Sequence, residues 1–218
     1  MTHNPWAAAL ATLFLWWFST GIILWRVRVA DNGSRQDHVN SVIIGLPLLA
    51  LGVAAAVASR HDLSANGIYA AFLAALALWG WIELAFLSGV VTGPNRTACP
   101  AGLPPAARFW RAVGTIAWHE GLLALTLLGL GALALGAANP FAFGTFALLF
   151  VARISAKLNL FLGVPRINTQ FLPRPLAHLP SHFRISRITG FFPLSVLALT
   201  VLAALLLERA INVADPGM

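Results

Sequence analysis

The sequence contains little charge. Only 10% of its 218 residues are Asp, Glu, Lys or Arg, whereas a soluble domain carries about 25%. Hydrophobic residues make up 59% of the chain, and the mean hydropathy is +0.80. The few polar residues gather in short patches between long apolar runs instead of forming the polar shell of a soluble fold. This composition excludes an ordinary soluble domain and predicts a membrane protein.

Cysteine and the common catalytic motifs are also scarce. Cys99 is the single cysteine, which excludes an intramolecular disulfide and a cysteine-based zinc site. The sequence contains neither a Gly-rich phosphate loop nor a GxSxG turn. It also lacks an HExxH motif, because the nearest match, WHEGLL, has no second histidine. The net charge of +7 is not accompanied by arginines interleaved with aromatics on one solvated face, so no nucleic-acid partner is expected. We therefore expect no metal site, and the sequence favours a non-catalytic protein over an enzyme.

Six apolar segments are each long enough to cross a hydrocarbon core of about 30 Å. They cover residues 6–24, 39–58, 67–91, 109–136, 141–163 and 188–211. Lipid supplies no hydrogen-bond partners to the backbone, and the alternating ten-residue patterns of a membrane barrel are missing, so the spans should be α-helices. The sequence predicts an all-α, six-transmembrane-helix bundle that forms one domain over residues 1–218.

Arginine is distributed unevenly among the segments between these spans. Ten arginines lie in three alternate segments: Arg26, Arg28 and Arg35; Arg96, Arg108 and Arg111; and Arg166, Arg174, Arg184 and Arg187. The opposite side of the membrane receives only Arg60 and Arg209. The positive-inside rule then predicts that the three basic segments are cytoplasmic and that both termini are periplasmic. Because Lys and Arg are missing before the first span, that span should be an uncleaved anchor.

The segment 164–187, VPRINTQFLPRPLAHLPSHFRISR, mixes prolines, aromatics and arginines. Such a segment can lie along the headgroups as a basic interfacial loop, where arginine meets anionic lipid. Alternatively, it is a docking surface for a partner. The candidate residues for lipid or partner contact are Arg166, Asn168, Arg174, His178, His182 and Arg184.

Charged side chains inside a membrane cost a few kcal/mol each on insertion scales, so they usually have partners. Glu83 lies in the third span, Glu120 in the fourth, and Arg153 and Lys157 in the fifth, with Asn159 nearby. Arg153 and Lys157 share one helix face because they are four residues apart. We expect these three spans to pack together, with Arg153 paired to Glu120 and Lys157 either paired to Glu83 or extended to the surface.

His119 and Trp118 are the candidates for pigment or ligand contact. Adjacent helical residues point about 100° apart, so if Glu120 faces the bundle interior, His119 should face a neighbouring helix, a groove or lipid. A neutral imidazole can ligate a metal or the magnesium of a chlorophyll, and Trp118 can stack on a flat macrocycle. The alternative role for His119 is an interhelical hydrogen bond worth about 1 kcal/mol.

Three stretches resemble the PuhE family, photosynthetic-complex assembly proteins of purple bacteria. They are WGWIELAFLSG in the third span, WHE in the fourth, and ARISAKLNLFLGVPRINTQFLP continuing to LAHLPSHF. The resemblance implies a multi-pass protein of the bacterial inner (intracytoplasmic) membrane. It also implies a role in assembly of the photosynthetic complex and in the supply of bacteriochlorophyll.

Three functions follow as hypotheses. The first is a non-catalytic assembly factor that holds or hands over bacteriochlorophyll or a precursor and binds reaction-centre or light-harvesting antenna subunits. The second is an accessory or catalytic membrane subunit of a bacteriochlorophyll-biosynthesis enzyme. The third is a proton-coupled small-solute carrier, which requires a continuous wet path through the intramembrane charges.

Overall fold

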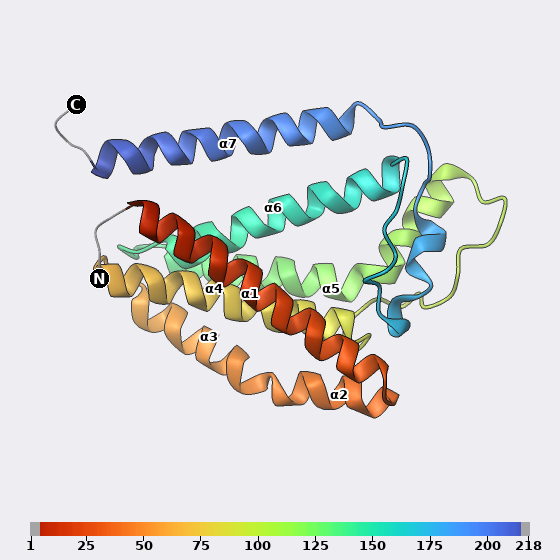
Figure 1. The fold of residues 1–218 in the computed structure, drawn as a ribbon, viewed down its shortest axis with the longest axis horizontal. Helices are drawn as coiled ribbons and strands as arrows, with labels where there is room; N and C mark the ends of the chain where they lie inside the picture. Colours follow the sequence, from red (N-terminus) through yellow and green to blue (C-terminus); the bar gives the residue numbers. More distant parts are fainter. Residues whose placement is uncertain (1–4, 215–218) are drawn as a thin grey trace.

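The computed structural model describes residues 5–214 of the chain as an assembly of helices (Figure 1). The α-helices are α1 (Pro5–Asp31), α2 (Arg35–Ile44), α3 (Leu46–Ser59), α4 (Ala65–Leu87), α5 (Pro105–Ala134), α6 (Phe141–Leu162) and α7 (Phe191–Ala214). Two short 3-10 helices, η1 (Arg174–Leu176) and η2 (Leu179–His182), lie between α6 and α7. Within residues 5–214 there is no β-strand, and a single bridge joins Val164 to Ile185.

Six helical segments are long and apolar enough to cross a membrane, with α2 and α3 together forming one of them. The predicted all-helical fold with six candidate spans is therefore confirmed. Figure 1 shows that α1 begins and α7 ends at the same end of the bundle, as an even number of crossings requires. The periplasmic position of that end stays a prediction. The opposite end, which carries the three arginine-rich segments, is called the basic end below.

The second span is not the single helix that the sequence suggested. It divides into α2 and α3 at Gly45, two residues before Pro47. Proline lacks a backbone N–H, and its ring collides with the carbonyl group four residues earlier, so the helical ladder is interrupted there. Near this break the indole N–H of Trp81 donates to the carbonyl oxygen of Val42 at 3.1 Å, which links α2 to α4.

Helix α4 ends at Leu87, four residues before the predicted boundary. Gly89 adopts a φ of 70°, in the left-handed region that glycine tolerates best. The N–H of Val90 donates to the Ala85 carbonyl at 3.0 Å, which closes the last turn. A side chain at Gly89 would collide with Pro175, so this turn also lets the segment after α6 approach the end of α4.

Helix α4 is the central helix of the bundle and contacts α1, α2, α3, α5 and α6. Its buried face is rich in alanine, including Ala71, Ala74 and Ala75, and small residues let helix backbones approach closely in membranes. Phe146 from α6 and Leu123 from α5 complete this apolar core and are fully buried. The core runs from the middle of the bundle toward the end farther from the basic end.

Candidate functional site

Four charged side chains and one histidine from three helices form a partly buried group, called the charge cluster below. Its members are Glu83 on α4, His119 and Glu120 on α5, and Arg153 and Lys157 on α6. Nη2 of Arg153 lies 2.8 Å from Oε2 of Glu83, and Nζ of Lys157 contacts Oε1 of Glu120. The two acids and two bases balance formally, so no charge of either sign is left uncompensated among them.

The pairing within the charge cluster corrects the sequence-based prediction, which joined Arg153 to Glu120. Arg153 instead binds Glu83, and Lys157 binds Glu120. Helix α5 begins at Pro105, and in Figure 1 its first turns point away from the line of the remaining helix. The two ion pairs therefore join α6 to α4 through Arg153 and α6 to α5 through Lys157.

The segment after α4 forms hydrogen bonds with backbone groups of α5 near this bend. The Asn95 N–H donates to the Gly114 carbonyl at 3.0 Å, and the Asn95 side-chain amide donates to the Arg111 carbonyl at 3.1 Å. The His119 N–H donates to the Thr92 carbonyl at 3.0 Å. These bonds join the segment after α4 to α5. His119 faces the neighbouring helix α4, as expected, and Glu120 faces α6, so both side chains reach the charge cluster.

His119 is fully buried within the bundle. Its Nε2 lies 3.7 Å from Oε1 of Glu83 and 3.9 Å from Oε1 of Glu120, while its ring packs on Phe86 with centroids 4.2 Å apart. Trp118, by contrast, is 61% exposed on the outside of the bundle. The structure therefore puts these two candidates on different faces, and ligation of a pigment by His119 stays a prediction.

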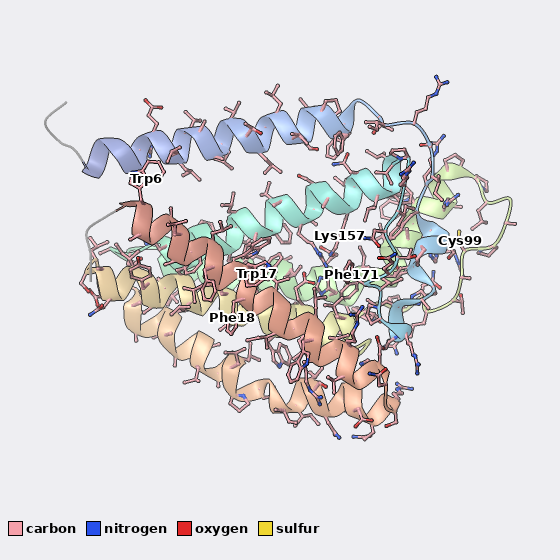
Figure 2. The ribbon with its side chains drawn as sticks, viewed as in Figure 1. Trp6, Trp17, Phe18, Cys99, Lys157 and Phe171 are labelled. Carbon is pink, nitrogen blue, oxygen red and sulfur yellow. The ribbon has the colours of Figure 1, made fainter. Side chains whose placement is uncertain are left out.

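An apolar cavity of about 580 Å³ lies beside the charge cluster. Helices α5 and α6, the end of α4 and the 164–187 loop line it, and it is partly open to the outside. Its aromatic lining includes Phe86, Phe109, Phe161 and Phe183, and its polar lining includes Thr115, Glu120, Arg153, Lys157, Asn168 and His182. Figure 2 shows Lys157 and Phe171, both lining residues, on the same side of the bundle as Cys99. An apolar pocket of this size with a few polar groups is typical of a small-molecule site.

The 164–187 loop folds back over the helices and covers one side of the cavity. Leu176 and Leu179 pack with Phe86 of α4 in a small buried cluster. Arg108 of α5 holds the loop through its guanidinium group, which donates to the carbonyl oxygens of His182 at 3.2 Å, Ser181 at 3.3 Å and Phe183. Arg108 was not a candidate from the sequence, where it counted only as one of ten basic residues.

His182 is the histidine that lines the cavity. Its side chain is 1% exposed, and burial lowers its pKa from the ordinary value of 6.5, which favours the neutral imidazole. Nδ1 lies 3.3 Å from the His178 carbonyl oxygen and 3.2 Å from Oγ of Ser181. When Nδ1 carries the proton and donates to that carbonyl, Nε2 keeps a free lone pair. Among residues 5–214, Nε2 has no hydrogen-bond partner.

The remaining candidate residues are spread over separate surfaces. Arg166, Asn168, Arg174 and Arg184 are exposed, whereas His178 is half-buried. Asn159, which the sequence grouped with the intramembrane charges, forms side-chain hydrogen bonds elsewhere, one of them to the Ser155 carbonyl oxygen. Its side-chain amide donates to Oγ of Ser195 on α7 at 3.0 Å. Asn159 therefore joins α6 to α7 in the bundle.

The fold and this site define a polytopic helical membrane protein with a charge cluster and a ligand-sized cavity near one end. Over residues 1–218 the chain belongs to the family described as "Protein of unknown function (DUF3623)". It is 54% identical over 216 residues to the "Uncharacterized 30.4 kDa protein in puhA 5'region" of Rhodobacter capsulatus. That match covers 99% of this chain and 79% of the relative. No solved structure matches the chain.

Proposed function

We propose that this protein is a membrane assembly factor for the photosynthetic reaction-centre or light-harvesting complex. In this proposal the cavity between α4, α5, α6 and the 164–187 loop holds bacteriochlorophyll or a precursor before its transfer. The observation that carries the proposal is the apolar cavity of about 580 Å³ with His182 in its wall. Reaction-centre or antenna subunits are the partners that would receive the pigment.

The relative's name supports a role connected with photosynthesis. That name puts the relative's gene in the region 5' of puhA, a photosynthesis gene. The 54% identity over 216 residues supports the same connection with photosynthesis for this protein. The resemblance to the PuhE family and the position in the bacterial inner membrane belong to the same proposal.

Two features of the cavity lining support a flat magnesium-bearing macrocycle as the ligand. Nε2 of His182 has a free lone pair in the neutral form, and neutral imidazole is a common metal ligand. Phe109 and Phe161, whose ring centroids lie 5.0 Å apart, form part of an aromatic wall on which a planar ring can stack. A bound macrocycle would supply the magnesium, and His182 and the aromatic wall would hold and orient it.

Pigment retention after gentle extraction tests the proposal. The full-length protein is expressed in a pigment-producing cell, solubilised in mild detergent and examined by absorption spectroscopy. We expect co-purifying tetrapyrrole in the wild type and at least a tenfold loss in His182→Leu, because the ligand is removed. His178→Gln is the matched control, since His178 is four residues earlier and does not line the cavity.

A second variant blocks the cavity without altering any titratable group. Ala156→Trp fills space in the cavity lining, whereas Gly144→Trp adds the same side chain where a Cβ meets no neighbouring atom within 4 Å. We expect pigment loss only in the first. Equal pigment in Ala156→Trp, His182→Leu and the wild type would contradict the proposal.

An accessory or catalytic subunit of a bacteriochlorophyll-forming enzyme is the second candidate. The observation that favours it is the presence of ionisable Glu120 and Lys157 in the cavity lining, since such groups can transfer protons. A strain without the protein distinguishes the two functions. An assembly factor predicts complete pigment with unassembled complexes, whereas an enzyme subunit predicts accumulation of one tetrapyrrole intermediate.

The apolar core argues against the third candidate, a proton-coupled carrier. Ala71, Ala75, Leu123 and Phe146 are at most 1% exposed and lie between the charge cluster and the end where α1 begins. A carrier needs a wet path through this region, and close-packed alanine, leucine and phenylalanine provide no polar groups for water.

A further inference from the structure

A second pocket at the basic end is polar where the cavity is apolar. It has a volume of about 370 Å³ and lies between the turn joining α1 to α2, the segment after α4, and η1. Eight of its eleven lining residues carry polar or charged side chains, and the other three are two glycines and a proline. Its lining shares no residue with that of the cavity. It is called the polar pocket below.

Three arginines from separate segments line the polar pocket. Arg35 begins α2, Arg96 follows α4, and Arg174 begins η1. All three are exposed, and within the described part of the chain none forms an ion pair with a carboxylate. Arginines brought together in this way repel one another unless an anion lies between them.

The one carboxylate in the lining belongs to Asp31, and it is already engaged. Its Oδ1 lies 3.2 Å from Nε2 of His38 and accepts a hydrogen bond from the Arg174 N–H at 3.0 Å. These contacts fix the positions of η1 and α2 around the polar pocket. Three guanidinium groups and a single carboxylate leave a net positive lining.

Buried polar atoms in the wall of the polar pocket also lack partners. Nδ1 of His38, Oγ of Ser88 and Oγ1 of Thr92 have no hydrogen-bond partner among the described residues. The three side chains belong to residues that are 4%, 4% and 2% exposed, respectively. Buried polar groups are nearly always hydrogen-bonded in native structures, so these three indicate a polar occupant.

We propose that the polar pocket binds a phosphate-bearing group, either the headgroup of an anionic phospholipid or a small soluble phosphate compound. Phosphate oxygens accept the paired N–H groups of arginine in a bidentate geometry, and the hydroxyls of Ser88 and Thr92 are donors of the right type. The arginine-rich end is also the one predicted to meet anionic headgroups, where each Lys or Arg contributes attraction.

Binding of defined probes to the purified full-length protein tests this site. The protein is held in neutral detergent and phosphate-free buffer, and its thermal unfolding midpoint is measured against dioctanoyl phosphatidylglycerol, inorganic phosphate, dioctanoylglycerol and sodium chloride. We expect a saturable rise of the midpoint with phosphatidylglycerol, and none with dioctanoylglycerol or chloride. A response to phosphatidylglycerol alone assigns a lipid headgroup, whereas a response to inorganic phosphate as well assigns a soluble phosphate compound.

Two sets of variants distinguish the polar pocket from general surface charge. Arg96→Gln with Arg174→Gln should weaken probe binding at least tenfold, because charged hydrogen bonds are lost. The charge-matched control, Arg184→Gln with Arg187→Gln, removes two exposed arginines outside the pocket and should leave binding unchanged.

Thr92→Val removes the unpartnered hydroxyl while keeping side-chain shape and net charge. This variant should weaken binding of the phosphate-bearing probe, while the thermal unfolding midpoint without probe stays at the wild-type value. It therefore tests the site even if the arginine variants misfold. Equal loss in the control pair, or no rise of the wild-type midpoint with either phosphate-bearing probe, would overturn the proposal.

Discussion

Lys157 is the single lysine of the chain, and it lies inside a membrane-spanning helix. Its ammonium group contacts the Glu120 carboxylate and lies 5.5 Å from the centroid of the Phe86 ring. A buried charge is tolerated when a counter-ion and further polar contacts replace water. At this scale the site depends on matched pairs, because removal of either member leaves the other without compensation.

The first prediction at the residue scale concerns this pair. Glu120→Gln should destabilise the protein by roughly 3–5 kcal/mol, because Lys157 then lacks its carboxylate, and membrane accumulation should fall. Glu120→Gln combined with Lys157→Met should recover much of the loss. Immunoblots of membrane fractions measure the effect, with Glu208→Gln, an exposed residue of α7, as the control. If the double variant is as poor as the single, the pair does not act as a unit.

The second residue-scale prediction concerns acid pH. Burial lowers the pKa of both His182 and His178 in the folded loop, and positive Arg108, Arg111 and Arg96 lie nearby. When the loop is detached, these two histidines bind protons below about pH 6.5, whereas in the docked loop they stay neutral to lower pH. The stability of the docked state is therefore full above that pH and falls as the pH is lowered.

Thermal unfolding midpoints at pH 7.5 and 5.5 measure this dependence. His182→Gln should reduce the drop at pH 5.5, whereas His61→Gln, an exposed histidine at the other end of the bundle, should leave it unchanged. A drop of the same size in His182→Gln and the wild type would assign the acid sensitivity to other groups.

At the scale of elements, the 164–187 loop behaves as a fixed cover over α5 and α6. Arg108 holds it at η2, and its two ends are joined where Val164 donates to the Arg184 carbonyl at 3.1 Å and Ser186 donates to the Val164 carbonyl at 3.0 Å. The loop also reaches the segment after α4, since the Cys99 N–H donates to Oγ of Ser181 at 2.9 Å.

Arg108→Gln should loosen this cover. The variant loses charged hydrogen bonds to carbonyl groups around η2, and each such bond is worth about 1.5–3 kcal/mol. Cys99 should then react about tenfold faster with a water-soluble maleimide at constant pH, since its neighbouring segment is released. Arg184→Gln is the control, because the exposed Arg184 side chain takes no part in the clamp. An unchanged labelling rate would show that the apolar contacts of Leu176 and Leu179 hold the loop by themselves.

The helices and their order were predictable because apolar length and backbone hydrogen bonding leave few alternatives inside lipid. The break at Gly45 was also readable in principle, since Pro47 lies inside the apolar run. The hydrogen bonds that α5 forms with the Thr92 carbonyl and with Asn95 were not predictable, because both residues belong to another segment. The acids and bases were identified from the sequence, whereas their pairing, which depends on how α4, α5 and α6 pack, was reversed.

At the scale of the whole molecule, the candidate sites with polar side chains lie toward one end of an otherwise apolar bundle. The charge cluster, the cavity and the polar pocket lie in the half near the basic end, and the alanine-rich core runs from the middle toward the other end. The charged residues could be identified from the sequence because a charge inside a membrane costs free energy. The cavity could not, because it arises from the packing of α5, α6 and the 164–187 loop. The role of His182 in the cavity wall depends on that same packing.

The charge cluster also has a consequence for biosynthesis. Both acids belong to spans that emerge from the ribosome first, and both bases belong to α6, which follows. Until α6 is delivered, Glu83 and Glu120 lack their counter-ions, so α4 and α5 cannot reach their final association at bilayer depth. The chain thus contains its own order of maturation, in which the arrival of α6 locks the two earlier helices into place.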